Sequence, residues 1–198
     1  MTYDPYDDRL FVDRELRWRK TSLTGLIALE LPVVKDGRGW SKETYNGDLE
    51  AGLPRGFSPV RWASNASRRL GTTRGIHAEL ANKLVSLERG ELLAVIVDFR
   101  AGRDFGRYEM IRLTVGTALL IPAGCGNSYQ TLTDDVHYAY LTDRNIAPRR
   151  PVTTVSLADP ALAIPWPIPL DRAIVLEEDQ GLPNLDQIEP LDLDRLKG

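Results

Sequence analysis

Short runs of β-branched and aliphatic residues, several of them alternating with polar residues, fill the chain from Thr24 to Thr142. The segment "GLIALELPVV" (25–34) alternates in this way, so that every second side chain would face a core. The sequence "KDGRGWSKETYN" (35–46) then begins with an Asp-Gly turn signal and continues as an extended segment. No long 3.6-residue period competes with the strand pattern, which therefore predicts an all-β domain.

Further short strands are expected at close spacing, with Gly-containing turns such as "ERGE" (88–91) and "TVGT" (114–117) between them. Eight or more short strands of this kind favour an antiparallel sandwich or barrel. We interpret the pattern as a double-stranded β-helix jelly roll of the cupin-like type. The expected strands are 60–67, 72–80, 83–88, 92–100, 108–114, 117–122, 128–133 and 136–142.

The two ends of the chain differ from this pattern. Residues 1–20 are polar and mixed in charge, and we expect an N-terminal arm in which 7–20 forms either a short helix or an arm that packs on a partner. The jelly-roll domain is assigned to 21–180, with a loop or short helix at 49–59. After Pro148 the chain is rich in proline, and we expect it to wrap the barrel. Residues 181–198 are predicted to form a tail with a short helix near Leu191.

Composition, charge and cysteine count argue against several classes of protein. The chain has 198 residues, of which 42% are hydrophobic and 27% charged, which is typical of a globular domain. A net charge of -3 gives no basic field for nucleic acid, and no apolar run approaches the roughly 20 residues that span a membrane. The acidic N-terminus does not resemble a signal peptide, so a cytoplasmic location is expected. The single cysteine, Cys125, rules out a disulfide framework within one chain and is expected to be a small buried residue.

The segment "GTTRGIHAELANKLVSLERGELLAVIVDFR" (71–100) carries His77 and Lys83, six residues apart in an expected strand pair. A metal-binding cupin needs three or four converging ligands, whereas only Glu79 stands beside His77 and the other histidine, His137, lies in a separate strand. We therefore do not expect a metal site, and the hypothesis reached below implies no organic cofactor either.

Acid/base chemistry is the functional interpretation of the same two residues. A histidine is a suitable base near neutral pH, and a buried lysine is costly unless it meets an anion. The pair suits removal of a proton α to a carbonyl, with Lys83 stabilising the enolate oxygen. On the pattern alone, the simpler alternative is favoured, in which His77 is a hydrogen-bonded core residue and Lys83 an exposed strand residue.

Several motifs occur in a specific order along the chain. The segments "DGRGWSKETYN" (36–46), "NAS" (65–67) and "TRGIH" (73–77) resemble D-x-R-G-x-F-x-E, N-x-S and L-R-G-L-H, which are motifs of the dTDP-4-dehydrorhamnose 3,5-epimerase family. The segments 82–100, "DFG" (104–106), "IPAGCGNSYQTL" (121–132), "YLTDRNIAP" (140–148) and "IPWP" (164–167) continue the series. Single motifs are weak, but their joint order and spacing over residues 24–179 is specific.

The resemblance implies a metal-free jelly roll that forms homodimers, and it assigns roles to individual residues. His77 stands at the catalytic base, Lys83 at the lysine facing the enolate oxygen, and Tyr140 at the tyrosine that delivers a proton from the opposite face. Asp179 aligns with the aspartate that orients the histidine, although Glu177 and Glu178 lie beside it. The resemblance places Arg38, Glu43, Asn65, Arg74 and Asn127 at substrate-binding positions, with the two arginines holding the sugar pyrophosphate.

Three departures from the family pattern affect the expected pocket. Asn127 replaces a second histidine, and an amide cannot shuttle a proton at neutral pH. Asn145 and Ile146 replace an aromatic pair, and Ser41 replaces the aromatic residue before the glutamate of the first motif, while Trp40 is retained. We interpret these changes as a different sugar, a different nucleotide, or one inversion instead of two; drift in a pocket with the same substrate is the alternative.

The resulting hypothesis is an epimerase that inverts C3, C5 or both in a nucleoside-diphosphate 4-keto-6-deoxyhexose through an enolate. A related nucleotide-sugar isomerase or dehydratase is one alternative. A non-catalytic jelly roll that binds a sugar nucleotide is another, although it would have no need of an acid and a base on opposite faces.

Overall fold

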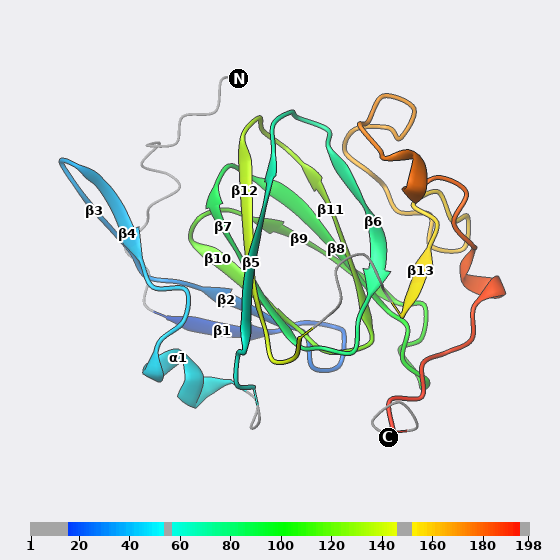
Figure 1. Ribbon diagram of the computed structural model, residues 1–198, viewed down its shortest axis with the longest axis horizontal. Coiled ribbons are helices and arrows are strands. Elements are labelled where there is room, and N and C mark those ends of the chain that lie inside the picture. The colour runs from blue at the N-terminus through cyan, green and yellow to red at the C-terminus, as the bar shows by residue number, and fades with distance from the viewer. Residues whose placement is uncertain (1–15, 54–56, 146–151, 195–198) are drawn as a thin grey trace.

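The computed structural model describes residues 16–53, 57–145 and 152–194, and most of its strands form two antiparallel sheets packed face to face (Figure 1). This arrangement confirms the predicted all-β jelly roll. The six-stranded sheet has the order β1 (Arg17–Lys20), β2 (Ile27–Glu30), β10 (Thr117–Ile121), β7 (Lys83–Arg89), β12 (Val136–Thr142), β5 (Arg61–Ser67). The five-stranded sheet has the order β13 (Thr153–Val155), β6 (Thr73–Ala78), β11 (Cys125–Thr131), β8 (Leu92–Asp98), β9 (Tyr108–Leu113).

The main core lies between the two sheets. Alternate residues of β7 and β8, such as Val85, Leu87, Ala94 and Ile96, point inward and are fully buried. This hydrophobic cluster occupies one part of the space between the sheets. Two residues of the cluster, Tyr129 and Tyr138, also line an open pocket. The core therefore fixes the spacing of the sheets at the edge of that pocket.

Each sheet also has a covered outer face. The chain from 152 to 194 runs along the five-stranded sheet, where Leu157, Leu162 and Ile164 pack on Ile76 and Phe99 (Figure 1). The partly buried Trp166 joins this cluster, in agreement with the expected C-terminal wrap. On the other sheet, α1 (Gly47–Gly52), Leu53 and Phe57 cover part of the outer face.

Helix α1 forms where the sequence allowed a loop or a short helix. The Asn46 side chain caps its first turn by accepting a hydrogen bond of 2.9 Å from the Leu49 N–H. Leu49 and Leu53 are buried together with Phe57 against Leu84 of the six-stranded sheet. Burial of this apolar face holds a helix that is too short to be stable alone.

The strands β3 (Val33–Asp36) and β4 (Gly39–Lys42) pair only with each other and form a hairpin that extends away from the two sheets (Figure 1). Val33 packs against Val115 and Trp40 at the base of the hairpin. Beyond this contact Val34 is 62% exposed. The hairpin is thus anchored at its base while its tip lies away from the barrel.

Some expected elements differ from the structure. Residues 17–20 form strand β1, so the helix considered for 7–20 does not include them, and residues 1–15 lie outside the described residues. In the tail, the helical turn is η3 (Leu185–Gln187), whereas Leu191 forms an isolated bridge with Arg100. None of the helices in the described ranges is long and apolar enough to cross a membrane.

The expected pairing of the strands that carry His77 and Lys83 is wrong. Strand β6 lies in the five-stranded sheet and β7 in the six-stranded sheet, because the chain crosses from one sheet to the other between Ala78 and Lys83. The alternation of residues reports which side of a strand faces the core, but not which strand is its neighbour. The two side chains therefore approach from facing sheets.

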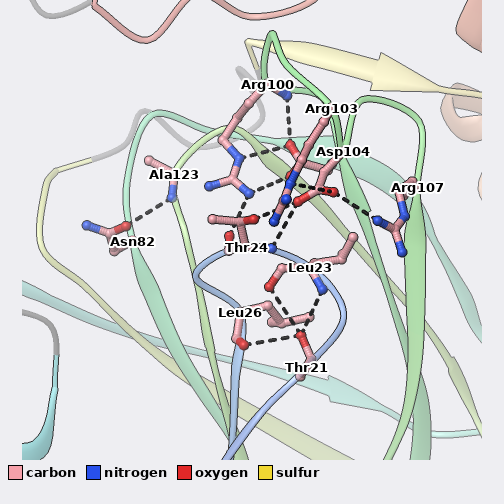
Figure 2. A network of polar contacts seen from close by, with 11 residues as sticks. Thr21, Leu23, Thr24, Leu26, Asn82, Arg100, Arg103, Asp104, Arg107 and Ala123 are labelled. Atoms are coloured by element: carbon pink, nitrogen blue, oxygen red, sulfur yellow. Dashed lines mark hydrogen bonds and ion pairs between the residues drawn. The ribbon is translucent and has the colours of Figure 1, made fainter.

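A network of charged residues ties the turn before β2 to the turn between β8 and β9 (Figure 2). The Arg100 guanidinium donates to the Thr24 carbonyl at 2.7 Å and to the buried Asp98 carboxylate. The buried Asp104 carboxylate accepts hydrogen bonds from the Thr24 hydroxyl at 2.7 Å and from Arg107 at 3.0 Å. These contacts hold the two turns together.

Candidate active site

A cavity of about 590 Å³ opens between the two sheets and is bordered by the C-terminal segment. Its size suits a small polar ligand. Strands β5, β7 and β12 supply one wall, β6 and β11 supply the facing wall, and residues near η2 (Glu177–Asp179) complete the rim. Among the side chains on these walls are His77, Lys83, Tyr140, Asp179, Asn65, Arg74 and Asn127.

His77 and Asp179 form a contact pair in this cavity. The Nε2 atom of His77 lies 2.8 Å from Oδ1 of Asp179, and the carboxylate side chain is only 3% exposed. The second carboxylate oxygen accepts a hydrogen bond of 3.0 Å from the Gly75 N–H. Glu178 also lines the cavity, but the hydrogen-bond partner of His77 is Asp179. A buried carboxylate with two fixed partners can hold the imidazole in one orientation.

Lys83 lies on the facing wall with a side chain that is 9% exposed. Its ammonium group forms an ion pair with Glu79, which follows strand β6. Burial, followed by the nearby charge of Arg61, lowers the pKa of Lys83 to about 8. Lys83 is therefore a cation within the cavity at neutral pH, close to the pH at which it loses its proton.

Three tyrosines lie close together in the cavity, two on the six-stranded sheet and one, Tyr129, on the facing sheet. Tyr138 stacks on Tyr129 with ring centroids 4.9 Å apart, and its ring lies 6.0 Å from that of Tyr140. Asn127 donates a hydrogen bond of 2.8 Å to the Tyr138 hydroxyl, which joins the two walls. Burial raises the pKa of Tyr138, so this phenol remains protonated. The position where the family pattern has a histidine thus holds an amide fixed against a phenol.

Several polar atoms of the cavity lack a hydrogen-bond partner within the described ranges. They are Nη1 of Arg61, Nε of Arg74 and Oδ1 of Asn127, all of which are buried. Most buried polar groups in proteins have a partner, so a group of such atoms on one cavity is unusual. Two cationic donors and one amide acceptor are suited to a ligand that carries anionic oxygens and hydroxyl groups.

Two of the predicted substrate-binding residues do not lie at this cavity. Arg38 is on the projecting hairpin, where its side chain is 91% exposed and pairs with Asp36. Glu43 follows the same hairpin and accepts a hydrogen bond from Asn46. Ser41 and Asn145 are exposed, and Ile146 lies outside the described residues. The hairpin departs from the barrel before it could bring these side chains to the cavity of its own chain.

Sequence reasoning missed four contributors to the site. Arg61 precedes Asn65 by four residues on one strand, so alternation alone places both on the same face. Glu79 was considered only as a metal ligand. Gly75 belongs to the "TRGIH" motif, and a side chain at this position would overlap both the Asp179 carboxylate and the His77 ring. Tyr138 gave no sequence signal beyond its strand pattern.

The structure also locates Cys125, His137 and the potential metal-binding side chains. Cys125 is buried, and burial raises the pKa of its thiol to about 12, which makes it a poor nucleophile. No cluster of three or more potential metal-binding side chains occurs in the part of the chain that the structure describes. His137 is exposed on β12.

Comparison with known proteins decides the family. The family model for dTDP-4-dehydrorhamnose 3,5-epimerase matches residues 20–187 of this chain. The chain belongs to the dTDP-4-dehydrorhamnose 3,5-epimerase family. The family resemblance seen in the motifs is thereby confirmed, and the protein is an isomerase of this family.

Some relatives of this chain are named as 3-epimerases and others as 3,5-epimerases. The chain is 33% identical to the RmlC homolog of Streptococcus pyogenes over 91% of its own length and 95% of that protein. It is also 33% identical to a dTDP-4-dehydro-6-deoxyglucose 3-epimerase of Streptomyces bikiniensis, over 87% of this chain and 90% of that one. The solved structure of RmlC from Streptococcus suis in complex with dTDP-D-xylose has a TM-score of 0.85 at 32% identity, and the match covers 91% and 97% of the two chains.

Proposed function

We propose that this epimerase acts on a nucleoside-diphosphate 4-keto-6-deoxyhexose and inverts C3, C5 or both. The convergence of the His77–Asp179 pair, Lys83 and Tyr140 on one cavity is the observation that carries this proposal. The activity named for one relative and the dTDP-D-xylose bound in a related structure support the choice of a dTDP-linked sugar.

In the proposed reaction, His77 removes the proton next to the keto group. Asp179 accepts the Nε2–H of His77, which leaves Nδ1 with the lone pair that takes the proton. The carboxylate then stabilises the imidazolium that forms. Gly75 holds the carboxylate in place through its backbone N–H.

Lys83 stabilises the negative charge that develops on the keto oxygen, and Tyr140 returns a proton to carbon. Strands β7 and β12 carry these residues on the wall that faces His77. Removal of a proton on one side of a carbon and its return on the other side inverts that carbon. Placement of the base and the acid on facing sheets therefore supports epimerisation.

The remainder of the substrate would be held by Arg74, Asn65 and Asn127. The unpartnered Nε of Arg74 suits a phosphate oxygen, and Asn127 Oδ1 suits a sugar hydroxyl. Binding of the nucleotide at a distance from the reacting carbon would supply energy to position the sugar ring.

Arg38 and Glu43 enter the proposal through a second copy of the chain. Their hairpin extends from the barrel, and Val33 packs on Val115 at its base (Figure 1). In the proposed homodimer, each hairpin would carry these two residues toward the cavity of its partner, where Arg38 would bind a phosphate.

Deuterium incorporation tests the function directly. The protein would be incubated in heavy water with dTDP-4-keto-6-deoxyglucose and the product analysed by mass spectrometry and proton NMR. His77→Ala is the inactive comparison. Two labels, at C3 and C5, would establish a double epimerase, while one label would establish a mono-epimerase and point to Asn127. Binding without any label, repeated across other nucleotide sugars, would instead support the non-catalytic alternative.

A further inference from the structure

Two charged side chains, Glu79 and Arg61, lie near Lys83 in the cavity. On the six-stranded sheet, Thr142 of β12 pairs with Lys83 on one side and with Arg61 on the other. Lys83 and Arg61 therefore stand in the same row, separated by one strand, and both line the cavity. Neither residue type is expected on a buried sheet face without a partner.

Glu79 reaches Lys83 from the facing layer. It follows β6 directly, and its carboxylate forms an ion pair with the Lys83 ammonium group. The two side chains are 19% and 9% exposed, so water screens their attraction only weakly. The pair connects the two walls at the end of the cavity where Lys83 lies.

Arg61 is the second neighbour, and it has a free donor. Its guanidinium carbon lies 5.5 Å from the ring centroid of Tyr140, while Nη1 is buried with no hydrogen-bond partner in the described ranges. Repulsion from Arg61 adds to burial in lowering the pKa of Lys83. By Coulomb's law, the Glu79 carboxylate in contact with Lys83 acts in the opposite direction and favours the ammonium form.

We propose that Glu79, Lys83 and Arg61 act as one unit in the active site. Glu79 is a positioning residue that keeps Lys83 protonated beside Arg61. Arg61 contacts substrate and donates its free Nη1–H to the oxygen that Lys83 also stabilises. The reacting end of the cavity thus holds an oxyanion between two cations, and the Glu79 carboxylate offsets their mutual repulsion. This inference rests on the proposed function for the identity of that oxygen.

Other ionisable groups share the cavity and enter the pH dependence. His77 with Asp179, and Arg74, come from the five-stranded wall and the C-terminal segment, and Glu178 lies at the rim. The tyrosines 129, 138 and 140 line the inner side. Only Glu79 is in ion-pair contact with Lys83 within the described ranges, so its variant isolates the effect on that ammonium group.

The first experiment titrates Lys83 in the protein without substrate. The chain contains five lysines, so NMR of protein labelled at the lysine Cε carbon resolves and assigns each of them. Glu79→Gln should lower the pKa of Lys83 by about one unit or more, and Arg61→Gln should raise it. The matched controls are Glu189→Gln and Arg89→Gln, which lie outside the cavity and should leave the titration of Lys83 unchanged.

The second experiment follows the rate of epimerisation as a function of pH. In Glu79→Gln, the alkaline fall in rate should begin at lower pH, and Glu79→Asp should restore part of the shift. In Arg61→Gln, the fall should begin at higher pH, yet the rate at neutral pH should drop about tenfold because a charged donor is lost. This combination of effects would not follow if Arg61 only stabilised the fold.

Each part of the proposal can fail separately. An unchanged Lys83 titration in a folded Glu79→Gln variant, or shifts of the same sign in both variants, would overturn the charge control. An unchanged neutral rate in Arg61→Gln would overturn its contact with substrate. If the titrations shift as expected but no nucleotide sugar exchanges its protons, the proposed function fails while the charge control stands. Circular dichroism of each variant establishes that it is folded before either measurement.

Discussion

Asp179 lies 2.8 Å from the Nε2 atom of His77 although 102 residues separate them in the chain. The histidine is on a central strand of the five-stranded sheet, whereas the aspartate is in a one-turn helix of the segment that wraps this sheet. Packing of that segment on Ile76 and Phe99 therefore determines the orientation of the proposed base.

Asp179→Asn should preserve the shape of this contact and remove its charge. The amide can no longer stabilise an imidazolium, so we expect the rate of proton exchange to fall by about 10²–10⁴-fold with little change in substrate binding. The rate of deuterium incorporation under saturating substrate is the measurement. Glu177→Gln, an exposed neighbour on the same turn, is the control and should retain its activity. Equal rates in Asp179→Asn and the wild type would contradict the assigned role.

Gly75→Ala should impair the same pair by a steric route. The new methyl group would overlap the Asp179 carboxylate and the His77 ring, so these side chains must separate. A misplacement of this size near reacting atoms costs about a hundredfold in rate. Gly47→Ala is the matched control, because a methyl group there meets open space. Steady-state rates of both variants, with melting temperatures, check the prediction; full activity of Gly75→Ala would show that the pair tolerates displacement.

The rate should decline at alkaline pH as Lys83 loses its proton. Its pKa is lowered to about 8, chiefly by burial, so the ammonium form predominates below this pH and is lost above it. We expect kcat to fall about tenfold for each pH unit above roughly 8, because only the cation stabilises an enolate. A pH–rate profile measured from pH 6 to pH 10 checks this. A rate that stays constant across that interval would exclude a required protonated Lys83.

Asp104 should contribute to stability in a pH-dependent manner. The Thr24 hydroxyl, followed by the Thr24 N–H and the charges of Arg103 and Arg107, holds the pKa of this carboxyl below its ordinary value. Because the folded state favours the ionised form, the stabilisation is complete above the unfolded pKa of about 3.9 and is lost as pH falls below it. Asp104→Asn should therefore melt earlier than the wild type at pH 7, with a smaller difference at pH 3.

Thermal unfolding at the two pH values provides the measurement for Asp104. Asp171→Asn, an exposed residue of the C-terminal segment, serves as the control and should match the wild type at both. If the destabilisation of Asp104→Asn were the same at pH 3 and pH 7, its carboxylate charge would have no part in the contact with Thr24.

Much of the fold could be predicted from the sequence because strand alternation reflects burial directly. The strands from Arg61 to Thr142 lie close to their expected ranges, and Cys125 is buried as expected. Alternation does not specify which strands become neighbours, since that choice depends on the packing of whole sheets. The sequence consequently suggested a pair of adjacent strands for His77 and Lys83, which the structure places on facing sheets.

The candidate site was predictable only in part for the same reason. The family motifs indicated His77, Lys83 and Tyr140, which share one cavity. Glu79 and Arg61 differ, because their relevance depends on contacts across the cavity that no local pattern encodes. Arg38 is the opposite case, since a motif indicated it but its hairpin carries it away from the cavity of its own chain.

The location of Asp179 has a consequence for the newly made protein. A ribosome delivers residues in chain order, and Asp179 follows all strands of both sheets. The barrel, with His77, Lys83 and Tyr140 already in place, can thus assemble before the partner of the base has been synthesised. Nascent chains would acquire their shape first and their full reactivity only when the segment that carries Asp179 docks on the outer face.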